Sequence, residues 1–194
     1  MKRLFQCMPK TITFDRTAVV QDVMELFWKK GYNGTSMQDL VDVTGLNRSS
    51  FYNTFGDKFS LFQEALKYYR EQQDQLLTDS FAEAKSPKQA IQGLFMGISD
   101  DIRAGNQKGC MFTSCTAEMS HETAVKDFLV DNMQGVISSF ATLIRQAQEQ
   151  GEISLRKDPE TLALFLFSNL QGLRLTSMLE PNLEAVTEEI LNIL

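Results

Sequence analysis

Residues 35–59 of the chain are TSMQDLVDVTGLNRSSFYNTFGDKF, and the expected architecture follows from them. Ser36 stands three residues before Asp39, a capping-box pattern that starts a short helix, and Gly45 supplies the turn after it. Asn47 is a suitable N-cap for a second short helix. Each helix has one apolar face and one polar face. The stretch therefore predicts a helix-turn-helix whose second helix suits the major groove of DNA.

Helical patterns continue on both sides of this motif. Apolar side chains recur at helical spacing over residues 14–30, and Asp57 caps a long helix that extends to about residue 82. Later helix starts are marked by proline at the expected first helical position: Ser86-Pro87, Asp158-Pro159 and Glu180-Pro181. The further expected helices cover residues 87–104, 109–120, 122–150, 158–178 and 182–193. No strand pattern or internal repeat competes, so the sequence predicts an all-α protein.

The expected helix at residues 158–178 is apolar almost all round between Leu162 and Leu175. A helix of this kind is covered on both faces. One interpretation is that it packs on its own domain and on a second subunit, and the other is that it is the central core helix of a monomer. Gly172 costs about 1 kcal/mol relative to alanine in a helix interior, which the close approach of another backbone would explain. The final helix, residues 182–193, is the expected partner in a homodimer interface.

The composition restricts the class of function. The net charge of the 194-residue chain is −6, but residues 1–60 carry eight basic and six acidic side chains, so an acidic body follows a weakly basic segment. Three cysteines, one histidine and no C-x-x-C pair predict no metal site and no disulfide scaffold. No nucleophile–base pair, carboxylate pair or glycine-rich phosphate loop is present. We therefore expect no enzymatic activity and no cofactor.

The sequence also predicts where the protein is found. No apolar run approaches the roughly 18 residues needed to span a bilayer, and the longest such run is LALFLF at residues 162–167. Two basic residues near the N-terminus are not followed by an apolar segment, so no signal peptide is expected. The expected location is the cytoplasm, with no membrane partner.

Residues 31–66, GYNGTSMQDLVDVTGLNRSSFYNTFGDKFSLFQEAL, closely resemble the TetR family of bacterial transcriptional repressors. The shared features are a Gly-aromatic turn, a Thr/Ser pair, an acidic-apolar helix and a Tyr-x-x-Phe-x-x-Lys tail. The resemblance implies a three-helix DNA-binding head, which we assign to residues 1–60. A ligand-binding and dimerising helical bundle follows, assigned to residues 61–194. It also implies a homodimer whose recognition helices lie about 34–36 Å apart or somewhat more, on a roughly palindromic DNA operator.

Eight residues of the head are candidate contacts to double-stranded DNA: Thr35, Ser36, Asn47, Arg48, Ser49, Tyr52, Asn53 and Lys58. Arg48 suits the O6 and N7 atoms of guanine, and a phosphate contact is the open alternative. The hydroxyls of Thr35 and Ser36 suit either a phosphate or helix capping. Asn47 and Ser49 suit base edges, unless Asn47 serves as the cap.

The remaining contacts of the head are expected at phosphates. The Tyr52 hydroxyl is assigned to a phosphate oxygen. The Lys58 ammonium is also assigned to phosphate, because a cation in the first turn of a helix is unfavourable without an anionic partner. Members of the family often have His or Tyr where Asn53 stands. The basic residues Lys2, Arg3 and Lys10 are either an arm on DNA or an untethered tail.

In the body, KGCMFTSCTAEMS at residues 108–120 resembles the Gly-Cys opening found in electrophile-sensing members such as the N-ethylmaleimide reductase repressor group. Lys108 and a helix N-terminus would lower the pKa of Cys110 and make it a sensor thiol. The alternative is a buried cysteine that acts as a small apolar residue. A disulfide between Cys110 and Cys115 is awkward at this spacing.

A ligand pocket is expected among the helices of residues 87–178, and for each candidate the alternative is a place in the core. The candidates are Phe95, Cys110, Phe112, Phe128, Phe165, Asn169 and Arg174. The expected function is a homodimeric DNA-binding regulator, a repressor released from its operator by a small-molecule or electrophilic inducer. The alternative is a helical protein–protein adaptor that does not bind DNA.

Overall fold

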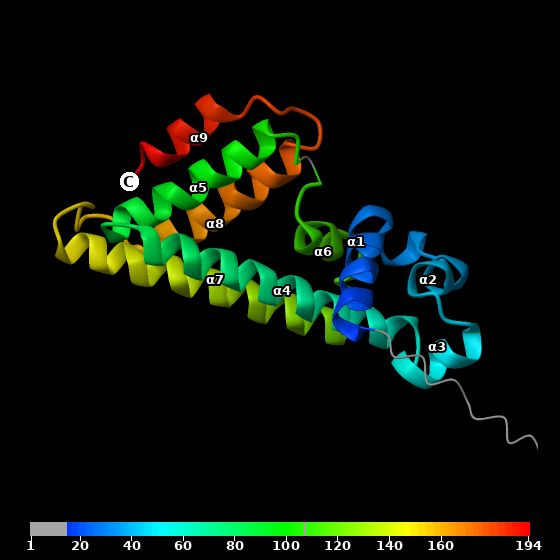
Figure 1. Ribbon diagram of the computed structural model, residues 1–194. Helices are drawn as coiled ribbons and strands as arrows, with labels where there is room; N and C mark the ends of the chain where they lie inside the picture. Colours follow the sequence, from blue (N-terminus) through cyan, green and yellow to red (C-terminus); the bar gives the residue numbers. More distant parts are fainter. Residues whose placement is uncertain (1–14, 107) are drawn as a thin grey trace, which may run out of the picture.

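The computed structural model describes residues 15–106 and 108–194. These residues form nine helices and no strand (Figure 1): α1 Arg16–Gly34, α2 Met37–Thr44, α3 Arg48–Phe55, α4 Lys58–Glu83, α5 Pro87–Arg103, α6 Met111–Met119, α7 Thr123–Glu149, α8 Pro159–Thr176 and α9 Glu184–Leu191. The all-α fold is confirmed, and most boundaries agree with the sequence prediction to within two residues. Lys2, Arg3, Cys7 and Lys10 lie outside the described residues. Among the described helices, none combines the length and apolar character required to cross a bilayer.

Local capping explains why the helices start where they do. Side-chain oxygens accept backbone N–H groups at six helix starts: Asp15, Ser36, Asn47, Asp57, Ser86 and Asp158. Pro87 and Pro159 occupy the first turns of α5 and α8. The largest departure is in α1, which continues to Gly34 across a kink at Gly31 (φ 73°, ψ 170°).

The three N-terminal helices form one end of an elongated molecule (Figure 1). α4 leads from them into the body, where it packs on α5 and its Arg70 pairs with Asp131 of α7, and α8 and α9 complete the bundle. α6 is placed between α1 and the body, and it contacts both α1 and α7. The body therefore reaches the N-terminal helices through two elements, the long helix α4 and the short helix α6.

The buried apolar residues divide into two clusters. One joins α5, α7, α8 and α9 around Phe95, Phe140 and Ile144. The other contains Phe51 and Leu40 of the N-terminal helices, and it continues without a break through the first half of α4 into α6 and the start of α7. The N-terminal helices therefore share a core with α6 and do not pack as a separate unit.

Candidate functional site

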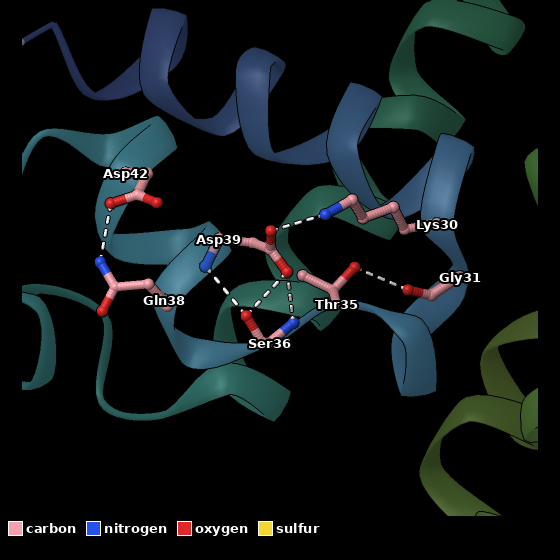
Figure 2. A network of polar contacts seen from close by, with 7 residues as sticks. All are labelled: Lys30, Gly31, Thr35, Ser36, Gln38, Asp39 and Asp42. Carbon is pink, nitrogen blue, oxygen red and sulfur yellow. Dashed lines mark hydrogen bonds and ion pairs between the residues drawn. The ribbon is translucent and has the colours of Figure 1, made fainter.

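A polar network fixes the junction between α1 and α2 (Figure 2). The Ser36 hydroxyl accepts the N–H of Asp39 at 3.1 Å, and one Asp39 oxygen accepts the N–H of Ser36 at 2.8 Å, which completes the predicted capping box. Lys30 Nζ lies 2.6 Å from the other Asp39 oxygen. Hydrogen bonds from Lys30 and Ser36 hold the pKa of Asp39 well below its usual value. The stabilising charge on Asp39 is therefore intact at neutral pH and is lost only as the pH falls through that lowered pKa.

The two hydroxyls at this junction that were predicted to bind phosphate have partners within the protein. Thr35 is only 1% exposed, and its hydroxyl donates to the carbonyl oxygen of Gly31 at 2.7 Å (Figure 2). The Ser36 hydroxyl is exposed but donates to Asp39 at 2.7 Å. Both hydroxyl protons are used inside the protein, because the kink at Gly31 turns Thr35 inward and the capping box occupies Ser36. Ser36 therefore has the capping role that the sequence offered as an alternative, whereas Thr35 donates to the kinked end of α1.

The outer face of α3 presents four of the six remaining candidates together. Arg48, Ser49 and Asn53 are exposed, and Tyr52 is 49% exposed. Positions 48 and 52, and positions 49 and 53, are four residues apart, so the four side chains share one helical face. The opposite face is buried through Phe51 and Phe55.

The other two candidates on or near α3 have partners within the chain. Asn47 accepts the N–H of Ser50 at 2.9 Å, so its side-chain oxygen is the cap. Lys58 Nζ lies 4.3 Å from the centre of the Tyr32 ring, within the range of a cation–π interaction. The first-turn lysine is thus stabilised by an aromatic face in the absence of DNA, a partner that the sequence prediction did not include.

Arg16 was not among the predicted residues, yet it holds α3 in place. Its guanidinium pairs with Glu64 of α4 at 2.7 Å and donates to the carbonyl oxygen of Thr54 near the end of α3 at 3.3 Å. It also lies 4.8 Å from the centre of the Phe55 ring. No sequence signal marks it, because its partners are 38 and 48 residues away.

A cavity of about 480 Å³ opens between α6, α7 and α8 in the body, lined mainly by apolar side chains. A much smaller cavity of about 40 Å³ adjoins it, and both are lined by Phe112, Asn132 and Gln171. Cys110 and Arg174 line the smaller one. The two together form a mainly apolar site with a few polar groups at one end, as ligand sites commonly do.

Of the seven predicted ligand-pocket residues, Cys110, Phe112 and Arg174 line these cavities and the other four do not. Phe95 is fully buried against Phe140, with ring centres 6.3 Å apart, so it belongs to the core. Phe128 packs between the Phe112 ring and the Arg70 guanidinium.

The last two predicted residues lie on the outer side of α8. Phe165 is 37% exposed, and the Asn169 amide donates to the Phe165 carbonyl oxygen at 2.8 Å. Asn132, which the prediction missed, is only 7% exposed and lies at the cavity wall. Its position on the apolar stripe of α7, three residues after Leu129, was the available signal.

Cys110 and Cys115 are both buried and free, but their surroundings differ. Burial alone raises the pKa of the Cys110 thiol, but the Arg174 guanidinium and hydrogen bonds from Thr113 and Tyr69 outweigh it, so the pKa lies below its usual value. Arg174 Nη1 is 3.7 Å and the Tyr69 hydroxyl 3.8 Å from the sulfur. Burial, together with the Glu118 charge, raises the pKa of Cys115 to about 12.

The cation beside Cys110 is therefore Arg174 and not the expected Lys108. Lys108 Nζ pairs with Glu25 of α1 at 2.7 Å and lies 5.3 Å from the centre of the Trp28 ring. Lys108 is only two residues before the thiol in sequence, but its side chain turns toward α1. Arg174 is 64 residues away, and α8 brings it to the start of α6.

Two family models match the chain. Residues 23–65 match the model described as bacterial regulatory proteins of the tetR family, which covers the N-terminal helices and the start of α4. Residues 87–190 match the model of the tetracyclin repressor-like C-terminal domain, which covers the helical body. The two matches together account for most of the chain.

Similar proteins agree with these matches. The chain is 30% identical to the transcriptional regulator YezE of Bacillus subtilis, with 84% of each chain covered. It is 29% identical to the transcriptional repressor ComR of Escherichia coli, with 94% of this chain and 90% of ComR covered. The fold matches a cysteine mutant of the regulator CifR complexed with a 26-bp double-strand operator DNA (TM-score 0.79, 27% identity, 92% and 96% coverage). These relatives are transcriptional regulators and not enzymes, and the chain belongs to the TetR family of DNA-binding transcriptional regulators.

Proposed function

We propose that the protein is a homodimeric repressor that leaves a palindromic operator when an electrophilic or other small-molecule inducer enters the body. In this proposal residues 1–60 are the DNA-binding head and residues 61–194 the ligand-binding and dimerising body. ComR and DhaR, both similar to this chain, are described as transcriptional repressors, which supports the direction of regulation. The observation that carries the inducer proposal is the buried Cys110 thiol beside the Arg174 guanidinium.

The DNA contacts proposed for the head are those on the exposed face of α3. Arg48 is proposed to read guanine, with Ser49 and Asn53 beside it, and the Tyr52 hydroxyl is proposed to bind phosphate. Lys58 is proposed to bind phosphate while its ammonium remains near the Tyr32 ring. At the start of α2 we assign the phosphate contact to free backbone N–H groups of the first turn, because the hydroxyls of Thr35 and Ser36 have internal partners.

The dimer is proposed to form through α8 and α9. α8 buries Leu166 and Leu170 in its own subunit, whereas its outer side exposes large apolar residues. The exposed residues on or just after α8 are Leu164, Phe165, Leu175, Met178 and Leu179. Exposed apolar surface of this extent is typical of an interaction site. A Cβ at Gly172 would meet no atom within 4 Å in the single chain, so the backbone here is open to the close approach of a second subunit.

The inducer is proposed to enter through the larger cavity and to react with or lie against Cys110 in the smaller cavity that adjoins it. The apolar lining suits an apolar compound, and the lowered pKa of Cys110 favours the thiolate, which is the nucleophilic form. A bond formed at this sulfur would add volume at the first residue before α6, in a cavity of about 40 Å³. Such an adduct displaces α6, Arg174 or both.

The adaptor alternative is set aside because the chain belongs to a family of DNA-binding regulators and exposes Arg48, Ser49 and Tyr52 on one helical face. Binding to DNA from the region upstream of its own gene tests the proposal directly. Specific binding at moderate salt supports a regulator. Binding that remains equally weak on all sequences at low salt would return the adaptor to consideration.

N-Ethylmaleimide is expected to release the wild-type protein from its operator, whereas the Cys110→Ser variant stays bound. The reason is that serine has the shape of the thiol but does not react with the maleimide. A gel shift with and without the reagent measures this, and Cys115→Ser is the matched control, because the Cys115 thiol is held neutral by its raised pKa. Release of the Cys110→Ser variant at the wild-type reagent concentration would contradict the thiol-sensing proposal.

The rate of Cys110 alkylation is expected to rise with pH and to level off below the usual thiol pKa of about 8.5. A lowered pKa means that the thiolate is already formed at lower pH, so the midpoint moves down. Arg174→Gln removes the guanidinium that favours the thiolate and is expected to move the midpoint up. Iodoacetamide labelling followed by mass spectrometry gives the profile residue by residue. An unchanged midpoint in Arg174→Gln would show that the guanidinium does not set the pKa of Cys110.

A further inference from the structure

A carboxylate of α6 binds the backbone of the head at the point where α1 ends. Glu118 Oε2 accepts the N–H of Tyr32 at 2.8 Å, and Glu118 Oε1 accepts the N–H of Asn33 at 2.7 Å. Both oxygens of one side chain are thus used on two consecutive amides. Glu118 comes from the body, 86 residues from Tyr32, so this is a specific link between the two parts of the protein.

The kink in α1 creates the need for this acceptor. Gly31 leaves the helical conformation with a φ of 73°, which interrupts the regular pattern of backbone hydrogen bonds just before Tyr32 and Asn33. The Tyr32 N–H is partly buried and therefore requires a partner, which Glu118 supplies, and the same carboxylate also accepts the exposed N–H of Asn33. A Cβ on residue 31 would lie 2.8 Å from Glu118 Oε2, so the carboxylate approaches as closely as it does only because this residue is glycine.

A second link joins the same two elements near the other end of α6. The indole N–H of Trp28 donates to the carbonyl oxygen of Lys108 at 3.1 Å, and Lys108 Nζ pairs with Glu25 at 2.7 Å. α6 and the segment before it are therefore attached to α1 at two places. Met111, Phe112 and Met119 of α6 also belong to the core that contains Phe51.

The turn held by Glu118 leads directly into the helix-turn-helix. The carbonyl oxygen of Gly31 accepts the buried Thr35 hydroxyl, and Lys30 pairs with Asp39 of α2 (Figure 2). The residues just before the two amides held by the carboxylate are thus bonded to the start of α2 and the residue that precedes it. α2 in turn packs against α3. A shift of α6 along or away from α1 would change the direction in which α3 is presented.

We propose that Glu118 is a positioning residue for operator binding, which sets the orientation of the helix-turn-helix relative to the body through the amides of Tyr32 and Asn33. A displacement of α6 that breaks these two hydrogen bonds lowers the affinity for the operator. Cys110, the N-cap of α6, and Glu118 are eight positions apart, or about 12 Å along the helix axis, so the sensor site of the proposed function and this link lie at opposite ends of one short helix. The positioning role rests on DNA binding and does not require any particular inducer.

The positioning role and a simple charge effect predict opposite changes in the affinity of Glu118 variants for DNA. Glu118 is an acidic residue next to a DNA-binding head, so its neutralisation alone should strengthen binding to the polyanion. The positioning role predicts the opposite. Glu118→Gln keeps the size of the side chain, but its amide offers a single carbonyl oxygen and places an N–H₂ group against the second backbone N–H.

The experiment uses an operator that the wild-type protein selects from random duplex DNA, together with versions in which the half-sites are one base pair closer or further apart. Glu118→Gln and Glu118→Ala are expected to bind the selected operator at least about five-fold more weakly, the lower end of typical coupling effects. They are also expected to discriminate less between the spacings. The amides of Tyr32 and Asn33 are expected to exchange with solvent faster. Glu122→Gln, which removes a nearby exposed carboxylate with no hydrogen bond to residues 15–60 of the head, is expected to retain wild-type affinity or exceed it.

Wild-type affinity in both Glu118 variants would overturn the proposal. An equal loss of affinity at every half-site spacing, together with a lower melting temperature, would also overturn it. That pattern is expected from a residue that only stabilises the fold. If Glu118→Ala does not fold, Glu118→Gln still gives the result, because its side-chain volume is nearly that of glutamate. A wild-type protein without any spacing preference would count against the proposed homodimer. The affinity and amide-exchange measurements would then decide the role of Glu118 alone.

Discussion

The Arg48→Ala variant is expected to lose about 1–3 kcal/mol of operator binding, a roughly 5- to 150-fold weaker affinity, and to lose its preference at one base position. Arg48 is the first residue of α3 and is exposed on the same face as Tyr52. A guanidinium at this end of a recognition helix can donate two hydrogen bonds to guanine O6 and N7, which no other base pair accepts in the same way. Titration of the operator and of single-base variants measures both effects.

Two variants serve as comparisons for Arg48→Ala. Arg156→Ala removes the same charge from an exposed loop between α7 and α8 and is expected to bind DNA as the wild type does. Lys58→Ala is expected to weaken binding to all sequences alike and to reduce the dependence on salt, as for a phosphate contact. Equal losses of Arg48→Ala on the operator and on random DNA would assign Arg48 to phosphate, the alternative that the sequence left open.

The Phe51→Ala variant is expected to lose about 3–5 kcal/mol of stability, which is large compared with the total stability of a typical domain. Phe51 is fully buried, and its ring centre lies 5.6 Å from that of Phe55. For a chain of this length the loss corresponds to a melting temperature about 6–20 °C lower. Because the core around Phe51 continues into α6, we expect the shift in the main unfolding transition and not only in a small separate one.

Circular dichroism during heating measures the transition, and Phe51→Leu, which leaves a smaller void, is expected to show a clearly smaller shift. Arg48→Ala is the functional counterpart, with altered DNA binding at an unchanged melting temperature. A Phe51→Ala protein that melts within about 2 °C of the wild type would contradict the assignment of this ring to the core.

Features that depend on neighbours in sequence could be predicted well. The capping box of Ser36 and Asp39, the cap at Asn47 and the start of α8 at Asp158-Pro159 all follow from contacts within four residues, and the structure contains each of them. The inward face of α3 also followed from helical spacing. The family resemblance was carried by this same local stretch.

Features that depend on how helices meet were predicted less well. Aromatic identity does not distinguish Phe112 at a cavity from Phe95 in the core, because both are apolar residues on helices of the same bundle. Lys108 was chosen as the partner of Cys110 because it is only two residues away in sequence, whereas the actual cation, Arg174, comes from α8. The link from Glu118 to the end of α1 has no local signal at all.

The continuous core that joins the head to α6 limits how this protein can be recombined with its relatives. A chimera that takes residues 1–60 from this chain and a body from another regulator would expose the surfaces of α1 that here pack on α4 and α6. It would also separate the amides of Tyr32 and Asn33 from Glu118. To combine the operator specificity of this protein with the inducer response of another regulator, it is therefore better to graft only the exposed face of α3. Its residues Arg48, Ser49 and Asn53 contribute nothing to that core.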